Sequence, residues 1–358
     1  MARQKKITFD TRYLPGLFDE MLRQDESDMP SAGPVRKATG NRGRPRKTPE
    51  RGMSGGEAEA LAASLPDGIE PLTSTVPVPT LRFISFGSGS SGNCSYLGND
   101  RFGILIDAGI DPTKIYQELE RNGIDIRTIG GIILTHDHGD HVRYAYTIVR
   151  RNRHIRIYCT PATLNGMLRR HNISRRIKDY HQPIFKEFPF HLSDFVITPF
   201  EVSHDGTDNV GFFISAGKHR FVVATDMGTV TERADYYIRQ ANHLMIEANY
   251  DHTMLLNGRY PEYLKARIMA AKGHMDNEAT AAYLKSIYTP SLLNIFLCHL
   301  SHDNNTPGTA LAAVCNALRG IGIEPGDGSE SITSRNAPVQ VSALPRFDST
   351  GVIVLRMT

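Results

Sequence analysis

The sequence predicts an α/β fold, a four-layer αβ/βα sandwich that follows an N-terminal tail. From about residue 81 to the C-terminus, short apolar runs bounded by glycine alternate with helical patterns, as strands and helices do in layered α/β domains. One apolar run leads directly into a cluster of histidines and aspartates at residues 135–141. Residues 1–79 are rich in basic, small and proline residues, which favours a disordered tail and linker. We therefore expect a tail over residues 1–79 and one folded domain over residues 80–358.

The chain has 358 residues, which is more than one average domain but compatible with one large domain and a tail. Hydrophobic residues make up 40%, enough for a substantial core, and the absence of an apolar run of about 18 residues argues against a membrane span. The charged N-terminus is followed by no apolar segment, so we expect no secretory signal. Scattered cysteines favour free thiols and a cytoplasmic protein; they are Cys94, Cys159, Cys298 and Cys315.

Positive charge is concentrated in the tail. From Arg36 to Arg51, seven Lys or Arg residues stand against one acid, Glu50. Residues 43–47, Gly-Arg-Pro-Arg-Lys, resemble the core of an AT-hook, in which an extended Arg-Pro-Arg lies along the minor groove of A·T-rich DNA. A solvated basic tail without a specific ligand is the alternative. In both cases, clustered positive charge attracts nucleic-acid phosphates.

The folded domain is expected to begin with a strand at residues 81–86, where apolar and polar side chains alternate. A loop of small residues, 87–94, follows this strand. The loop lacks the Gly-Lys-Ser/Thr ending of a P-loop, which argues against a nucleotide site. Residues 95–97 and 103–106 then predict a β-hairpin, and Asp107 stands at the end of its second strand.

The most specific feature is the sequence Thr-His-Asp-His-Gly-Asp-His at residues 135–141. It lies where an apolar strand ends and a helix is expected to begin. Imidazoles and carboxylates are the ligands that zinc, manganese and iron accept. Asp140 and His141 are adjacent and must diverge, which suits two metal ions better than one. A polar loop without metal is the alternative, but His136 and His138 in this spacing behind a buried strand favour a metal site.

A second group of basic residues surrounds an expected strand at residues 155–159 and an expected helix at residues 161–172. These side chains form either a surface that faces phosphates or an ordinary solvated helix face. The sequence alone leaves both interpretations open. The group consists of Arg156, Arg169, Arg170, Arg175, Arg176 and Lys178.

Two further candidate ligands follow apolar strands. His204 comes just after the strand expected at residues 195–202, and Asp226 follows the strand expected at residues 220–224. Taken alone, His204 suits a core histidine and Asp226 a helix N-cap equally well. The cluster at residues 135–141 makes a shared metal site the favoured interpretation for both.

The C-terminal part of the sequence adds an acid and three histidines. Glu247 lies near the end of an expected strand, and His274 opens an expected helix. A histidine at a helix start beside a glutamate on a strand makes an oriented proton donor, although a simple helix cap is the alternative for His274. The next expected strand leads into His299, which we predict as a metal ligand in preference to His302.

The pattern His-x-His-x-Asp-His at residues 136–141 resembles the signature of the metallo-β-lactamase fold, and the resemblance extends over the whole expected domain. The segments Ser-Gly-Ser-Ser-Gly-Asn at residues 88–93 and Leu-Ile-Asp-Ala-Gly at residues 105–109 are similar to the opening of its YycJ/WalJ branch, which is related to RNase Z. The stretch from Asp226 to His299 is too short for a β-CASP cap domain, and we find no long arm like that of RNase Z. The order of elements therefore matches the YycJ/WalJ branch of the metallo-β-lactamase sandwich.

This resemblance implies a site with two divalent metal ions, Zn or Mn, that share a hydroxide for attack on phosphorus. Asp140 would also orient the hydroxide, and Asp107 would support the metal-site loop without binding metal. Glu247 would steer His274, which protonates the leaving oxygen. The implied metal ligands are His136, His138 and His204 for the first ion, Asp140, His141 and His299 for the second, and Asp226 as the bridge.

The implied activity is that of a metal-dependent phosphodiesterase or nuclease, specifically a 5′-to-3′ DNA exonuclease with no membrane attachment. A hydrolase of small esters, lactones or cyclic phosphodiesters is the alternative, and an uncharged groove beside the metals would favour it. A flavodiiron-like enzyme is disfavoured because its first motif carries Glu in place of the second His. A DNA-tethering module without activity would need a broken metal site, and the sequence shows none. The sequence leaves open the metal, DNA versus RNA, the polarity of digestion and the oligomeric state.

Overall fold

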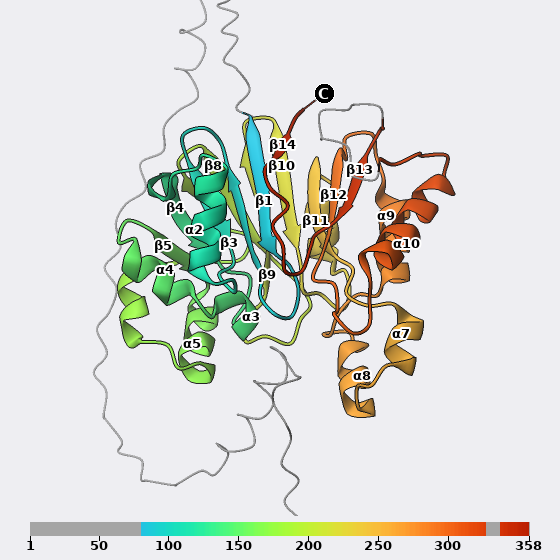
Figure 1. Ribbon diagram of the computed structural model, residues 1–358, viewed down its shortest axis with the longest axis horizontal. Coiled ribbons are helices and arrows are strands. Elements are labelled where there is room, and N and C mark those ends of the chain that lie inside the picture. Colours follow the sequence, from blue (N-terminus) through green and yellow to red (C-terminus); the bar gives the residue numbers. More distant parts are fainter. Residues whose placement is uncertain (1–79, 327–336, 358) are drawn as a thin grey trace, which may run out of the picture. The chain divides into compact units, whose positions relative to one another are not determined.

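The computed structural model describes residues 80–326 and 337–357 of the chain. Within this part, two seven-stranded sheets pack face to face, with helices on both outer sides (Figure 1). The predicted four-layer αβ/βα sandwich is therefore confirmed. The predicted tail at residues 1–79, with its AT-hook-like segment, lies outside the described residues.

The first sheet, sheet A, is mixed: its first three strand pairings are antiparallel and its last three are parallel. Its strand order is β14 (Ile353–Leu355), β1 (Leu81–Gly87), β2 (Cys94–Gly98), β3 (Gly103–Ile106), β4 (Ile129–Ile133), β5 (Arg156–Cys159) and β6 (His181–Pro183). The pairing of β1 with β14 joins the first and last described strands, and it places Phe83 opposite Ile353.

The second sheet, sheet B, is also mixed, with three parallel pairings followed by three antiparallel ones. Its strand order is β13 (Gln340–Ala343), β12 (Asn294–Cys298), β11 (His243–Glu247), β10 (His219–Ala224), β9 (Val210–Ala216), β8 (Phe195–Glu201) and β7 (Phe190–Leu192). Every residue of β11 and β12 is buried, as expected for parallel strands that are covered on both faces.

Apolar side chains from both sheets form the central layer of the core. Phe83 of sheet A lies between two aromatic rings of sheet B, with its ring centroid 5.2 Å from that of Phe221 and 4.7 Å from that of Phe296. All three side chains are fully or almost fully buried. Aromatic rings at these separations attract each other, and this attraction adds to the free energy gained by burying their apolar area. The three rings therefore help to hold the two sheets together.

Helices cover the outer face of each sheet (Figure 1). Sheet A packs against α2 (Pro112–Arg121), α4 (Ala145–Arg151) and α5 (Pro161–Arg170). Sheet B packs against α6 (Glu232–Ile238), α9 (Asn277–Ile287) and α10 (Pro307–Arg319). The shorter helices are η2 (Ile126–Thr128), α3 (Gly139–Val142), η3 (Arg175–Tyr180), α7 (His252–Asn257) and α8 (Glu262–Ile268). None of the described helices combines the length and apolar character that a bilayer crossing requires.

Local sequence explains where the helices near the site begin. Thr160 caps α5 because its hydroxyl accepts a hydrogen bond from the backbone N–H of Thr163 at 3.1 Å, and Pro161 occupies the first turn. Asp276 caps α9 in the same way through Ala279 N at 2.7 Å. These caps fix the start of each helix, and therefore also the loops that lead from the sheets into them.

Candidate metal centre

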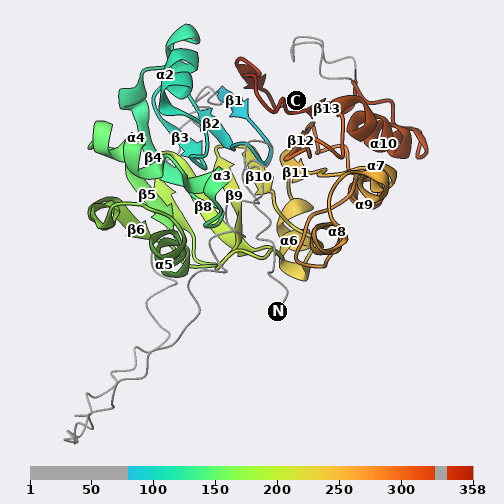
Figure 2. The same cartoon turned by 60° about the horizontal axis from the view of Figure 1, so that its bottom comes forward.

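The predicted site residues gather at one edge of the sandwich, beyond the carboxyl ends of parallel strands from both sheets. Figure 2 brings this edge forward, with α3 beside it. Because β4 ends at Ile133 and α3 begins at Gly139, His136 and His138 lie in the turn between them, while Asp140 and His141 lie in α3 itself. The sequence predicts this position between a strand and a helix. Carboxyl ends of parallel strands are where open α/β sheets bind their ligands.

Three acidic or imidazole side chains reach this edge from residues with left-handed backbone conformation. Asp107, Asp226 and His299 have φ values of 60°, 52° and 55°, and each lies one or two residues beyond the end of its strand. The left-handed conformation costs a non-glycine residue about 1–2 kcal/mol. Its occurrence at three positions of one site shows that the surrounding structure holds these turns for the direction that they give the side chains.

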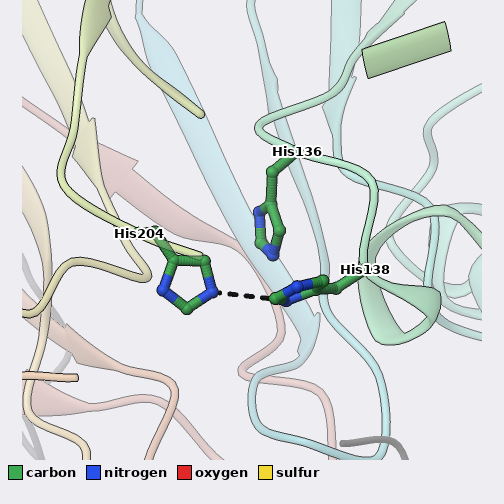
Figure 3. A group of neighbouring side chains, drawn as sticks. All are labelled: His136, His138 and His204. Atoms are coloured by element: carbon green, nitrogen blue, oxygen red, sulfur yellow. Dashed lines mark hydrogen bonds between the residues drawn. The ribbon is translucent and has the colours of Figure 1, made fainter. Parts of the chain in front are cut away.

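The first cluster consists of His136, His138 and His204 (Figure 3). Nε2 of His204 lies 3.2 Å from Nδ1 of His138. The other ring nitrogen of His204, Nδ1, donates to the carbonyl oxygen of Gly273 at 3.0 Å, so the lone pair of Nε2 faces the cluster. Burial lowers the pKa of all three rings, and that of His138 falls to about 3. The rings are therefore neutral, which is the form that binds metals.

The second cluster consists of Asp140, His141 and His299, all buried. Oδ2 of Asp140 lies 3.3 Å from Nε2 of His299 and 3.5 Å from Nε2 of His141. On the outer side of His141, Nδ1 lies 2.8 Å from Oδ2 of Asp107, whose other oxygen accepts a hydrogen bond from Thr135 N at 2.9 Å. Asp107 thus holds both the ring and the backbone of the ligand-rich segment from behind.

Asp226 lies between the two clusters. Its carboxylate oxygen Oδ2 faces four ring nitrogens at 3.4–3.7 Å, the Nε2 atoms of His141, His299, His136 and His204. Burial alone would raise the pKa of Asp226, but the facing imidazole rings hold it well below its usual value. Asp226 is therefore an ionised carboxylate that both clusters share.

The charges of the two clusters differ. Burial would lower the pKa of His299, but Asp226, Asp140 and Glu247 raise it to about 10. Carboxylates that demand a positive charge so strongly also attract a divalent cation. In the first cluster, Nε2 of His136 is buried without a hydrogen-bond partner among the described residues. Both the excess of buried carboxylates and this ring nitrogen fit a site for divalent metal ions.

Glu247 connects three segments of the site. Its Oε1 accepts hydrogen bonds from Nδ1 of His274 at 2.6 Å and from Nδ1 of His299 at 3.0 Å, and its Oε2 accepts from Met227 N at 2.9 Å. Burial alone would lower the pKa of His274, but the charge and hydrogen bond of Glu247 raise it above its usual value. The sequence predicts the pairing of Glu247 with His274, whereas the bond to His299 is found only in the structure.

The loop at residues 87–94 supports the second cluster. Nδ2 of Asn93 lies 3.2 Å from Oδ2 of Asp140, and Oγ of Ser88 accepts a hydrogen bond from His299 N at 2.9 Å. Sequence reasoning assigned no role to these two residues. The signal for them is the Ser-Gly-Ser-Ser-Gly-Asn segment itself, which is interpreted above only as a family resemblance and as an incomplete P-loop.

Asp205 and Arg267 tie α8 to the first cluster. Oδ1 of Asp205 lies 3.3 Å from Nε2 of His138, and Oδ2 accepts a hydrogen bond from Nε of Arg267 at 2.7 Å. Oδ1 also lies 3.5 Å from Nε2 of His204, so this carboxylate adds negative charge beside two imidazole rings of the first cluster. This contact was not predictable from the sequence, because Asp205 and Arg267 come from segments far apart in the chain.

The structure separates the two competing histidines after β12. The side chain of His299 is 2% exposed and lies in the second cluster. The side chain of His302 is 61% exposed, and its Nδ1 pairs with Asp303 at 2.7 Å. The structure therefore brings all seven candidate ligands together and leaves His302 outside.

A four-layer αβ/βα sandwich with buried histidine and aspartate clusters at one sheet edge defines a metal-dependent hydrolase of the metallo-β-lactamase fold. Residues 103–295 match the family described as "Beta-lactamase superfamily domain". The chain is 30% identical over 256 residues to "Exodeoxyribonuclease YycJ" of Bacillus anthracis. The matched region covers 70% of this chain and 94% of that protein. The chain belongs to the beta-lactamase superfamily, in the branch of the YycJ and WalJ proteins.

Two further proteins are similar to this chain. "Exodeoxyribonuclease WalJ" of Streptococcus pneumoniae is 29% identical over 248 residues, which cover 68% of this chain and 91% of that protein. The crystal structure of the metallo-β-lactamase fold protein YhfI from Bacillus subtilis superposes with a TM-score of 0.53. At 15% identity, with 76% of this chain and 98% of that chain covered, it supports the fold alone.

Proposed function

We propose that this chain is a 5′-to-3′ DNA exonuclease that uses two divalent metal ions. The observation that carries the proposal is Asp226, whose Oδ2 is shared by two adjoining clusters of buried imidazoles and carboxylates. The names of the two curated relatives, both exodeoxyribonucleases covered over more than nine tenths of their length, support DNA as the substrate. Cleavage of a phosphodiester is a reaction for which paired metal ions are well suited.

The ligands would divide between two ions, Zn or Mn. His136, His138 and His204 would hold the first, and Asp140, His141 and His299 would hold the second. Asp226 would contact both, because one of its oxygens already lies between the clusters. When bound, such ions polarise phosphoryl oxygens and lower the pKa of water, so that a nucleophile forms at neutral pH.

Other groups of the chain would move protons at defined atoms. The carboxylate of Asp140, held by Asn93, would accept a hydrogen bond from the attacking water and so align it with the phosphorus. His274 would donate the proton from Nε2 to the leaving 3′ or 5′ oxygen, because its Nδ1 is occupied by Glu247. Glu247 would therefore keep His274 both charged and correctly turned.

The test is a substrate panel with purified protein that is loaded with Mn²⁺ or Zn²⁺. We expect mononucleotides to be released from a 5′-labelled duplex before label leaves a 3′-labelled one, and we expect covalently closed circular DNA to stay intact. The matched controls are His299→Ala, which should remove activity, and His302→Ala, which changes an exposed histidine outside the cluster.

Three outcomes of this panel would contradict the proposal. Nicking of the circular DNA would indicate an endonuclease, and release of 3′ label first would reverse the polarity. Hydrolysis of lactones or thioesters with no cleavage of DNA would make the chain a small-molecule hydrolase. RNA and single-stranded DNA in the same panel show whether the site selects duplex DNA.

A further inference from the structure

A groove with basic walls lies between α5 and η3, beside the metal centre. It has a volume of about 580 Å³. Its lining includes Asn165, Leu168 and Arg169 of α5, Arg175 and Lys178 of η3, and Thr207. We call these six residues the basic groove.

The basic groove is built on the same loop as the metal centre. Thr207 donates from its backbone N–H and its hydroxyl to the carboxylate of Asp137, at 2.8 Å and 2.5 Å. Asp137 stands between His136 and His138 in the ligand-rich segment. Any Cβ at position 166 of α5 would overlap the Asp137 carboxylate, so Gly166 allows the helix to approach this closely. The groove is therefore fixed in position relative to the candidate ligands.

The lining of the basic groove contains three basic side chains and no acidic one among the described residues. Arg169, Arg175 and Lys178 are exposed, and none of them forms an ion pair with an acid among the described residues. The neighbouring Arg170 is different, because its Nε lies 3.7 Å from Oδ2 of Asp137. Three cations from two separate elements that converge on one hollow create a positive potential that favours an anionic ligand.

The shape and chemistry of the basic groove indicate a chain-like ligand. An open groove accommodates an extended polymer that passes through it. Along such a polymer, an arginine binds a phosphate through two parallel N–H groups, and a lysine binds one through its single ammonium charge. The amide of Asn165 adds a hydrogen-bond donor for phosphate or sugar oxygens.

We propose that the basic groove binds the phosphodiester backbone of the nucleic-acid strand next to the scissile bond. The assignment rests on the proposed nuclease function, since the bound strand is the substrate of the metal centre. Recognition through phosphates alone makes this site indifferent to base sequence.

The test compares two triple variants of the metal-loaded, full-length chain. The first variant removes the three basic side chains of the groove, by Arg169→Ala, Arg175→Ala and Lys178→Ala. The second removes three cations from other exposed positions, Lys218→Ala, Arg220→Ala and Lys285→Ala. Lys218 precedes β10 and Arg220 is its second residue, whereas Asp226 lies beyond the other end of this strand. These two control positions are therefore at the opposite end of β10 from the metal centre.

Binding is measured by fluorescence anisotropy with a nuclease-resistant phosphorothioate duplex at several salt concentrations. Each phosphate contact contributes about 0.9 to the slope of log affinity against log salt. Loss of two or three contacts in the groove variant should therefore make the slope shallower by about 2–3, while the control variant should change it by less than about 1. Equal changes in the two variants would overturn the proposal.

Two further measurements separate the possible failures. Competition with inorganic phosphate tests for a small-anion site: if the groove variant loses phosphate binding but keeps its affinity for the duplex, the groove is not a backbone site. Cleavage is measured separately on unmodified DNA. If the unaltered chain binds the phosphorothioate duplex through the groove but fails to digest DNA, the proposed exonuclease function is wrong while the binding site stands.

Discussion

Replacing His274 by alanine separates proton donation from metal binding. His274 is buried, and its Nδ1 is held by Oε1 of Glu247 at 2.6 Å, so the ring is already oriented before a substrate arrives. General acids of this kind contribute roughly 10²–10⁴-fold to a rate. Since the ring is fixed and its pKa is raised, we expect a loss of about 10³-fold in kcat on DNA, or about 4 kcal/mol of barrier.

The assay uses two substrates that differ in their leaving group. Nucleic-acid cleavage expels a strongly basic alkoxide, which needs a proton, whereas bis(p-nitrophenyl) phosphate expels a stable phenolate, which does not. His274→Ala should therefore slow the second substrate by less than about tenfold. The matched control is His252→Ala, which removes an exposed imidazole at the start of α7.

Two results would refute this reasoning. Equal losses on both substrates would mean that His274 does not act as the general acid. A fall in bound metal, measured by elemental analysis of the purified variant, would instead make His274 a ligand, which its proximity to Asp226, Glu247 and His299 allows geometrically.

The remaining predictions concern the metal clusters and the core. Glu247→Gln should reduce DNA cleavage more than His274→Ala does, because Glu247 holds His299 as well as His274. The same substitution should weaken metal binding by about 10–100-fold. Unchanged metal affinity would argue against a link between Glu247 and the ligand His299. His299→Ala should abolish activity while His302→Ala keeps most of it, and the reverse result would shift the last ligand by three residues. Elemental analysis after reconstitution should find two ions per chain, and a maximum of one would rule out the bridged site. His243, whose pKa burial lowers from 6.5 to about 3, is neutral in the folded state, so its contribution to stability is complete above pH 6.5 and is lost as the pH falls toward 3. Urea unfolding should show the stability difference between the unaltered chain and His243→Gln shrinking by about 1.4 kcal/mol per pH unit below pH 6, and a constant difference would contradict this assignment.

The sequence predicts the part of the site that is local in the chain. His136, His138, Asp140 and His141 stand within six residues behind an apolar strand, so their spacing alone indicates a metal site. A single residue such as His204 gives no comparable signal, because a lone histidine after a strand has several ordinary explanations. The assignment of His204 as a ligand therefore depends on the family resemblance.

The contacts that orient the candidate ligands were not predictable in this way. Asn93 and Asp140, or Asp205 and Arg267, come from segments far apart in the chain, and no local periodicity encodes their pairing. The same limit applies to the fold. The strands β6 and β7 have only three residues each, which is too short for an alternating pattern, whereas β11 and β12 are long and apolar enough to be predicted.

The pairing of β1 with β14 has a consequence for how the domain is made. During synthesis, β1 is the first of the described strands to emerge, and its outer edge stays unpaired until Ile353–Leu355, the last strand described, has been made. Until then, the backbone groups of an apolar strand that includes Leu81 and Phe83 are open to pairing with other chains, a known route to aggregation. Pairing across so large a sequence separation is also slow to form. A chain that stops before Ile353 would keep every candidate metal ligand and still leave this edge unprotected.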